Sequence, residues 1–135
     1  MIKIINLVKL SIKSDERGSL VFAEALNQIP FSIKRIFYIF NTKNNGCRGY
    51  HAHKNNKIVL FCLQGSSLIK LDNGKEKTQY LLDKPNVGII INNKIWHSME
   101  KFKKNTILLA ISSEKYDEND YLRNYNQFKQ YLKQK

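Results

Sequence analysis

Apolar and polar residues alternate over short stretches along most of this chain, and turn residues separate the stretches. A period of two is typical of β-strands, and many short strands divided by turns favour an antiparallel sandwich or barrel. Asn73 and Gly74 tolerate positive φ, so they predict a tight hairpin, and a second turn is expected at 64–66. The pattern predicts ten strands: Ile2–Val8, Ser19–Ala25, Ile33–Phe40, Arg48–His53, Ile58–Gln64, Ser67–Asp72, Lys77–Leu82, Gly88–Ile91, Trp96–Lys101 and Thr106–Ser112.

The C-terminal segment follows a different period. From Asp117 onward apolar residues recur at helical spacing, with acidic residues at the start and lysines near the end, which suits the helix dipole. These apolar positions are Tyr121, Leu122, Tyr125, Phe128 and Leu132. The spacing predicts one helix whose apolar face packs on the sheets or on a partner subunit.

Length and composition narrow the class of protein. A chain of 135 residues with 42% hydrophobic residues is expected to form a single domain over 1–135. No stretch has the length of a membrane span or the form of a signal peptide. Cys47 and Cys62 form no metal-binding or redox spacing, which is typical of a cytoplasmic protein.

The net charge of +12 raises the question of nucleic-acid binding. The excess comes mainly from lysines spread along the chain, without a basic tract or a helix-turn-helix pattern. We therefore expect no nucleic-acid partner, and a positive surface that suits an anionic small molecule such as a nucleotide sugar.

Three histidines carry the candidate chemistry. His51 and His53 lie two residues apart, so in a strand both imidazoles point to one face, and His97 could join them from a later strand. Clustered imidazoles serve proton transfer or metal binding. A His-x-His strand in a small β-barrel suggests a cupin, a double-sheet jelly roll. The metal-binding cupins also use a glutamate, where this chain has Lys57 or Ile58, so a pocket without metal is expected.

Several stretches, in order along nearly the whole chain, carry a more specific resemblance. They are Asp15–Leu20, Ile33–Phe40, Arg48–Lys54, Trp96-His97 with Met99, and a C-terminal set from Tyr116 to Phe128. The chain resembles the nucleotide-sugar 3,4-ketoisomerases, cupins of the WxcM-like family. The resemblance implies an isomerase that moves the keto group of dTDP-4-keto-6-deoxyglucose from C4 to C3, for deoxyamino sugars of surface polysaccharides. It implies no cofactor.

The resemblance and the chemistry together suggest roles for four residues. Moving the ketone requires a base for the C3 proton, for which imidazole titrates in a suitable range, and we assign this role to His51. His53 could shuttle protons between O3 and O4, and the Tyr38 phenol could polarise the carbonyl. Arg48 suits the diphosphate. A regular strand would place it on the opposite face from His51, but a bulge or the start of the strand could turn it toward the ligand.

Two further residues bear on the configuration of the product. Arg17 together with His97 resembles the branch that forms the galacto product, with His97 as an acid opposite His51 and Arg17 holding it or the sugar. Many relatives have a glutamate where this chain has Ser98, and its loss could leave His97 without an orienting partner. A gluco product, a metal-dependent cupin and a non-catalytic nucleotide-sugar-binding module remain alternatives.

The resemblance also implies a homodimer, whose subunits can exchange N-terminal strands. The stretch 58–63 has no polar position, so it is expected to be buried on both faces, and a second subunit could cover one of them.

Overall fold

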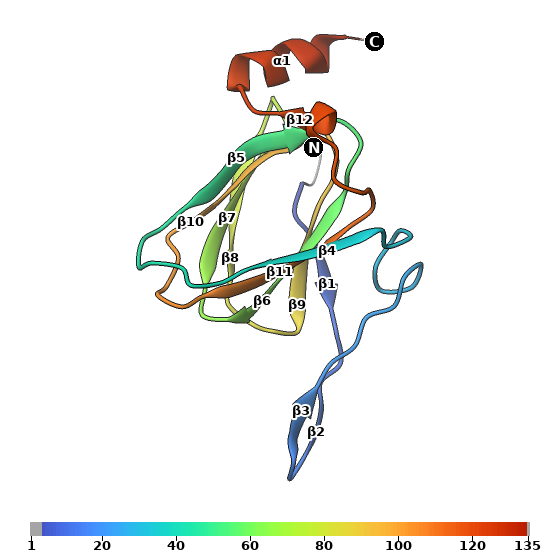
Figure 1. The fold of residues 1–135 in the computed structure, drawn as a ribbon, viewed down its shortest axis with the longest axis vertical. Coiled ribbons are helices and arrows are strands. Elements are labelled where there is room, and N and C mark those ends of the chain that lie inside the picture. Colours follow the sequence, from blue (N-terminus) through green and yellow to red (C-terminus); the bar gives the residue numbers. More distant parts are fainter. Residues whose placement is uncertain (1–3, 135) are drawn as a thin grey trace.

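The computed structural model describes residues 4–134, and it consists mainly of antiparallel strands (Figure 1). The strands are β1 (Asn6–Lys9), β2 (Lys13–Asp15), β3 (Gly18–Leu20), β4 (Arg35–Ile39), β5 (Arg48–His53), β6 (Ile58–Gln64), β7 (Ser67–Asp72), β8 (Lys77–Leu82), β9 (Val87–Ile91), β10 (Trp96–Glu100), β11 (Ile107–Ser112) and β12 (Tyr121–Leu122). One sheet has the order β1-β9-β6-β11-β4, and the other has the order β12-β5-β10-β7-β8. The all-β, double-sheet class predicted from the sequence is therefore confirmed.

The strands from β5 to β8 begin and end where the alternation and the turn residues predict. Between β7 and β8 the Asp72 carboxylate accepts a hydrogen bond from the Gly74 N–H at 2.7 Å, and Gly74 has a φ of 94°. Glycine reaches this conformation without steric cost, so the hairpin forms where the sequence predicts it.

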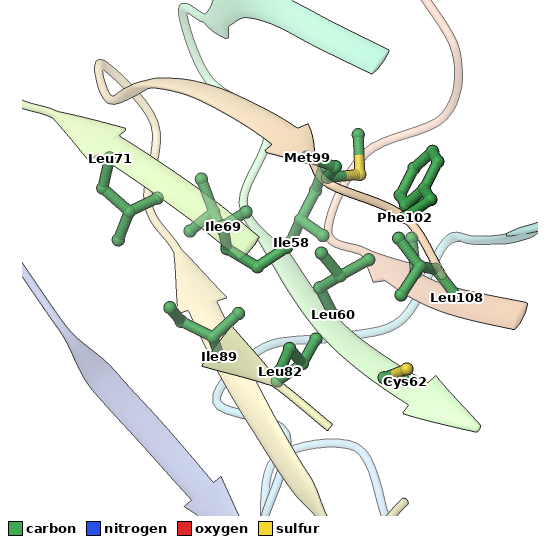
Figure 2. Packing of buried hydrophobic residues seen from close by; sticks show 12 residues of the cluster. Ile58, Leu60, Cys62, Ile69, Leu71, Leu82, Ile89, Met99, Phe102 and Leu108 are labelled. Atoms are coloured by element: carbon green, nitrogen blue, oxygen red, sulfur yellow. The ribbon is translucent and has the colours of Figure 1, made fainter. Parts of the chain in front are cut away.

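The main hydrophobic core lies between the two sheets (Figure 2). It contains Ile58, Leu60, Cys62, Ile69, Leu71, Leu82, Ile89, Ile91, Met99, Phe102, Leu108 and Ala110. The other face of β6 is also buried, because Val59 and Phe61 pack against Val8, Ile29 and Phe31. Strand β6 is thus buried on both sides as predicted, but this chain supplies the cover itself and no second subunit is needed there.

The N-terminal region differs most from the predicted strands. The strand expected at Ser19–Ala25 ends at Leu20, and it pairs with β2, which the sequence pattern did not predict. This β2–β3 hairpin projects from the sheets at the end opposite the C-terminal helix (Figure 1). Of the strand predicted at Ile2–Val8, β1 keeps the C-terminal part, and residues 2 and 3 lie outside the described range.

The C-terminal helix, α1, spans Tyr125–Lys133 and begins later than predicted. The short 3₁₀ turn η1 (Glu118–Asp120) comes first, and then β12 pairs with β5. Asn124 caps α1, because its side chain accepts a hydrogen bond from the Gln127 N–H. Pairing with the edge of β5 thus replaces the first helical turns. No helix in residues 4–134 is long and apolar enough to cross a membrane.

Candidate active site

A β-bulge in β5 decides which side chains enter the site. His97 of β10 pairs with His51, but the next residue, Ser98, pairs with Gly49, so Tyr50 is the extra residue. Tyr50 has a φ of 60° and Gly49 a φ of 97°, both in the left-handed region. The bulge turns Arg48 to the same side as His51, since both line one cavity, while Tyr50 lines a groove on the other face. A regular strand would have kept Arg48 out of this cavity.

The three histidines form one cluster, as the sequence predicts. The ring centroids of His51 and His97 are 4.8 Å apart, those of His51 and His53 are 5.1 Å apart, and those of His53 and His97 are 5.8 Å apart. His53 and His97 are buried, and His51 is partly exposed toward the cavity. The i, i+2 spacing in β5 and the pairing of β5 with β10 are what bring these rings together.

Burial keeps these imidazoles neutral at physiological pH. Loss of hydration lowers the pKa of His51 to about 4, and the charge of His53 adds to the effect. The pKa of His53 also falls to about 4, first through burial and then through His97. Burial lowers the pKa of His97 to about 3. Each ring therefore has a nitrogen with a free lone pair that can accept a proton.

A backbone carbonyl orients one of these rings, and a carboxylate lies beside another. The Nδ1 of His97 lies 3.1 Å from the Ile95 carbonyl oxygen, which can only accept, so Nδ1 carries the hydrogen and Nε2 has the lone pair. Ser98 donates to Glu100 instead, so Ile95 supplies the orientation of His97 for which the sequence lacks a glutamate. The Nδ1 of His53 lies 3.4 Å from a carboxylate oxygen of Asp120.

The cluster lies at one wall of a cavity of about 420 Å³ between the two sheets. Arg48 and Arg123 both line it, together with apolar residues from both sheets. Within residues 4–134 Arg48 forms no ion pair, whereas Arg123 holds Glu118 through two hydrogen bonds of 2.7 and 2.9 Å. Lys57 is exposed and does not line the cavity, so its charge does not oppose a ligand there.

Tyr121 is a residue of the site to which sequence reasoning assigned no chemistry. Its ring lies 4.5 Å from that of His53 and 5.1 Å from that of His51, and Arg123 stacks 4.2 Å above it. The sequence pattern placed Tyr121 on a helix, and its pairing with His53 in β12 appears only in the tertiary structure.

Tyr38 borders the same cavity as the imidazoles, but from the exposed face of β4. In β4 the less exposed positions alternate with exposed ones, and Tyr38 shares the exposed face with Ile36 and Phe40. It borders the cavity, but its ring packs on Phe40 at 5.9 Å and not on a histidine. The phenol that accompanies the imidazoles is that of Tyr121.

Arg17 does not reach the cavity of its own chain. It lies at the tip of the β2–β3 hairpin, where its side chain is 86% exposed and its guanidinium pairs with Asp15 at 2.6 Å. Within one chain Arg17 therefore contacts neither His97 nor the cavity in which a sugar would lie.

The three histidines also have the composition of a metal site. Among residues 4–134 they form a group in which one nitrogen of each ring lies within 4.8 Å of the others. Neutral imidazoles are suitable ligands for zinc, and three of them leave a position open for a fourth ligand. No carboxylate belongs to this group, so its chemistry suits proton transfer at least as well as tight binding of a divalent cation.

Comparison with known proteins gives consistent results. The model of the FdtA family, described as WxcM-like, C-terminal, matches residues 2–133. The chain is 45% identical, over 130 residues, to TDP-4-oxo-6-deoxy-alpha-D-glucose-3,4-oxoisomerase of Aneurinibacillus thermoaerophilus. The match covers 96% of this chain and 91% of that protein.

Solved structures of similar proteins have the same fold. One of them is the H51N mutant of the 3,4-ketoisomerase QdtA from Thermoanaerobacterium thermosaccharolyticum, in complex with TDP-4-keto-6-deoxyglucose. It is 38% identical in sequence, with a TM-score of 0.93, and the match covers 98% of this chain and 96% of that chain. The TDP-quinovose 3,4-ketoisomerase WlaRB from Campylobacter jejuni is 40% identical with a TM-score of 0.91, covering 96% and 99%. The TDP-fucose-3,4-ketoisomerase WlaRA from the same organism is 32% identical with a TM-score of 0.88, covering 94% of each chain.

Proposed function

The chain belongs to the FdtA family of WxcM-like proteins and is a 3,4-ketoisomerase of TDP-sugars, and we propose that it converts TDP-4-keto-6-deoxyglucose to TDP-3-keto-6-deoxygalactose. The observation that supports this reaction best is the cluster of three neutral imidazoles at one wall of a cavity that two arginines also line. An isomerisation of this kind needs no external oxidant or reductant, because it exchanges the positions of a ketone and a neighbouring hydroxyl group.

The proposed reaction passes through an enediol. His51 removes the proton from C3, and the electron pair forms the C3–C4 double bond while O4 gains a proton. The O3 hydroxyl then loses its proton, a proton is delivered to C4, and the ketone forms at C3. The net change moves one proton from C3 to C4 and one from O3 to O4. A neutral imidazole can accept each of these protons.

His53 is proposed to carry the oxygen-bound proton, since it lies beside His51 on the same strand and lines the same cavity. We propose that Tyr121, and not Tyr38, donates to the developing enolate oxygen, because its ring contacts both histidines of β5. Tyr38 then bounds the mouth of the cavity. Arg48 is proposed to pair with the diphosphate, which its lack of an intramolecular ion pair permits.

The configuration at C4 depends on which face of the enediol receives the proton. We propose that His97 delivers it and so gives the axial hydroxyl of the galacto product. The neutral ring has its hydrogen on Nδ1, held by Ile95, so Nε2 must first take up a proton from solvent before it can act as the acid. His51 then releases the proton taken from C3 to solvent, and both rings return to the neutral state. Relatives that act on TDP-quinovose and on TDP-fucose are both similar to this chain, so the product requires a direct measurement.

The first prediction concerns this product. Chelator-treated protein incubated with fresh TDP-4-keto-6-deoxyglucose in H₂O should produce a ketone at C3, seen by proton NMR, with a small H4–H5 coupling. The small coupling reports an axial hydroxyl at C4. A parallel reaction in D₂O should show whether solvent deuterium enters C4.

Three other outcomes would change this assignment. A large H4–H5 coupling would reject the role of His97 and leave the reaction intact. Activity that appears only after zinc, iron or manganese is restored would favour a metal-dependent cupin. Binding of TDP by folded protein without conversion above the no-enzyme control would indicate a binding module.

A dimer is also proposed, with Arg17 reaching the cavity of the second copy. The outward face of the edge strand β4 exposes Ile36, Tyr38 and Phe40 by 58%, 62% and 58%, and an edge strand with such a face suits pairing with another chain. The projecting hairpin that carries Arg17 has the shape of an arm that could extend across a neighbouring subunit (Figure 1).

The second prediction tests this assembly. Light scattering after size exclusion should give about twice the chain mass of 15.8 kDa, and Ile36→Lys should shift the protein toward the monomer because a buried lysine would lack a partner. Lys75→Ala, at an exposed position in the turn between β7 and β8 of the other sheet, serves as the control and should leave the mass unchanged. A monomeric wild-type protein at micromolar concentration would contradict the proposal.

A further inference from the structure

A buried carboxylate lies directly behind the histidine cluster. Asp120 ends the η1 turn, and the next residue, Tyr121, pairs with His53 across β12 and β5. This pairing places an Asp120 carboxylate oxygen 3.4 Å from the Nδ1 of His53, and both side chains are more than 90% buried. Within residues 4–134 this Nδ1 forms no hydrogen bond, so its contact with Asp120 is one of proximity and charge. Sequence reasoning gave Asp120 no role, because it was expected in the first turn of a helix.

Backbone N–H groups hold this carboxylate in place. One oxygen accepts a hydrogen bond from the Asn55 N–H at 2.8 Å, and the other accepts one from the Asn56 N–H at 3.2 Å. The Asp120 carbonyl oxygen also accepts from the Lys54 N–H at 2.8 Å. These contacts fix Asp120 to the loop that follows His53.

His53 is the basic side chain that lies close to the Asp120 carboxylate. Within residues 4–134 no lysine or arginine forms an ion pair with Asp120, and the neutral His53 ring lies at its side. A carboxylate can only accept a hydrogen bond, so it favours the His53 tautomer that carries the hydrogen on Nδ1. The other nitrogen, Nε2, is then left with its lone pair, and His53 lines the cavity.

We propose that Asp120 is the positioning residue for His53: it fixes the tautomer with hydrogen on Nδ1 and stabilises the imidazolium while Nε2 holds the hydroxyl proton of the substrate. This inference rests on the proposed function, in which His53 moves that proton between O3 and O4. Burial lowers the pKa of His53, and Asp120 acts in the opposite direction. The carboxylate thus reduces the cost of placing a positive charge on a buried ring during the transfer.

Asp120→Asn tests the pairing with little change in volume. An amide NH₂ facing His53 would donate to Nδ1 and so move the ring hydrogen to Nε2, where it would block proton uptake. We expect kcat to fall about 10²-fold or more, with KM changed only a few-fold, because substrate contacts remain. In a His53→Gln background the same change should cause no further loss, since the partner is then absent.

Asp117→Asn is the matched control. It makes the same chemical change three residues earlier, at an exposed side chain that, within residues 4–134, accepts a hydrogen bond only from the Asn119 N–H. Its kcat should stay within about two-fold of wild type, as is usual for surface changes. An equal loss of kcat in the two variants would overturn the proposal.

The tautomer can be measured without any kinetics. The chain has only three histidines, so a two-bond ¹H–¹⁵N spectrum contains three imidazoles, and His53→Gln identifies one of them by its disappearance. At pH 7 wild-type His53 should carry its hydrogen on Nδ1, and Asp120→Asn should move it to Nε2. A wild-type ring protonated on Nε2 would reject the proposal, even if Asp120→Asn failed to fold.

This spectrum also separates the two hypotheses. Protein that shows the expected tautomer but does not convert TDP-4-keto-6-deoxyglucose would contradict the proposed function and keep the Asp120–His53 pairing. Protein that converts the sugar with His53 in the other tautomer would contradict the pairing alone.

Discussion

Replacing His51 with asparagine should reduce the rate of isomerisation by about 10³-fold, the usual size of a general-base contribution. Asparagine approximates the shape of the imidazole but cannot accept a proton from carbon near neutral pH. The cavity keeps Arg48, Arg123 and the apolar wall, so affinity for TDP should remain within a few-fold of wild type. Exchange of the C3 proton with D₂O, followed by proton NMR, measures the step directly, and calorimetry with TDP measures the binding.

Tyr50→Phe provides a neighbouring control, because Tyr50 lies next to His51 but lines the groove on the other face of the sheet. It should keep the C3 exchange rate within a few-fold of wild type. Exchange at the wild-type rate in His51→Asn would show that another group is the base, and His53 would then be the first candidate because the two rings are adjacent.

The strand that carries His51 illustrates how much of the site local sequence determines. Alternation alone placed His51 and His53 on one face, and the structure has them there, beside His97. Alternation could not place Arg48, because a bulge adds one residue to a strand. The side chains before the bulge then point to the opposite face of the sheet from the one that alternation predicts. Gly49 was the available signal, since a glycine inside a strand often marks a bulge.

The C-terminal segment illustrates the opposite case. Helical spacing from Asp117 onward hid Asp120 and Tyr121, which contact His53 from η1 and β12. Their placement depends on pairing with β5, a tertiary contact that outweighs local helical preference. The Asn124 cap was the local signal for the true start of the helix. The role of Arg17 could not be predicted from one chain, because the fold of a single chain does not bring Arg17 to the cavity.

Moderate acid should destabilise this protein well before its carboxylates become protonated. In the folded chain His51 and His53 have pKa values of about 4 and His97 has one of about 3, whereas an unfolded histidine titrates near 6.5. Between these values the unfolded chain binds more protons than the folded one, so stability falls as the pH decreases through this window. Each imidazole that the folded chain keeps neutral should make the unfolding free energy about 2 kcal/mol lower at pH 5 than at pH 7 or above. Urea unfolding at pH 7.5 and pH 5 measures the difference.

His97→Gln separates this effect from other causes. Glutamine does not titrate. The difference in unfolding free energy between pH 7.5 and pH 5 should therefore be about 2 kcal/mol smaller in the variant than in the wild-type protein, whatever the variant's absolute stability. Glu118 is exposed, and its ion pair with Arg123 lowers the pKa of its carboxyl to about 2, so it does not titrate in this window. Equal stability of the wild-type protein at the two pH values would mean that the folded imidazoles titrate near the unfolded value of about 6.5 and become protonated by pH 5. His51 would still be mostly neutral at pH 7.5, so that result would contradict the lowered pKa values and leave the role of His51 as the base intact.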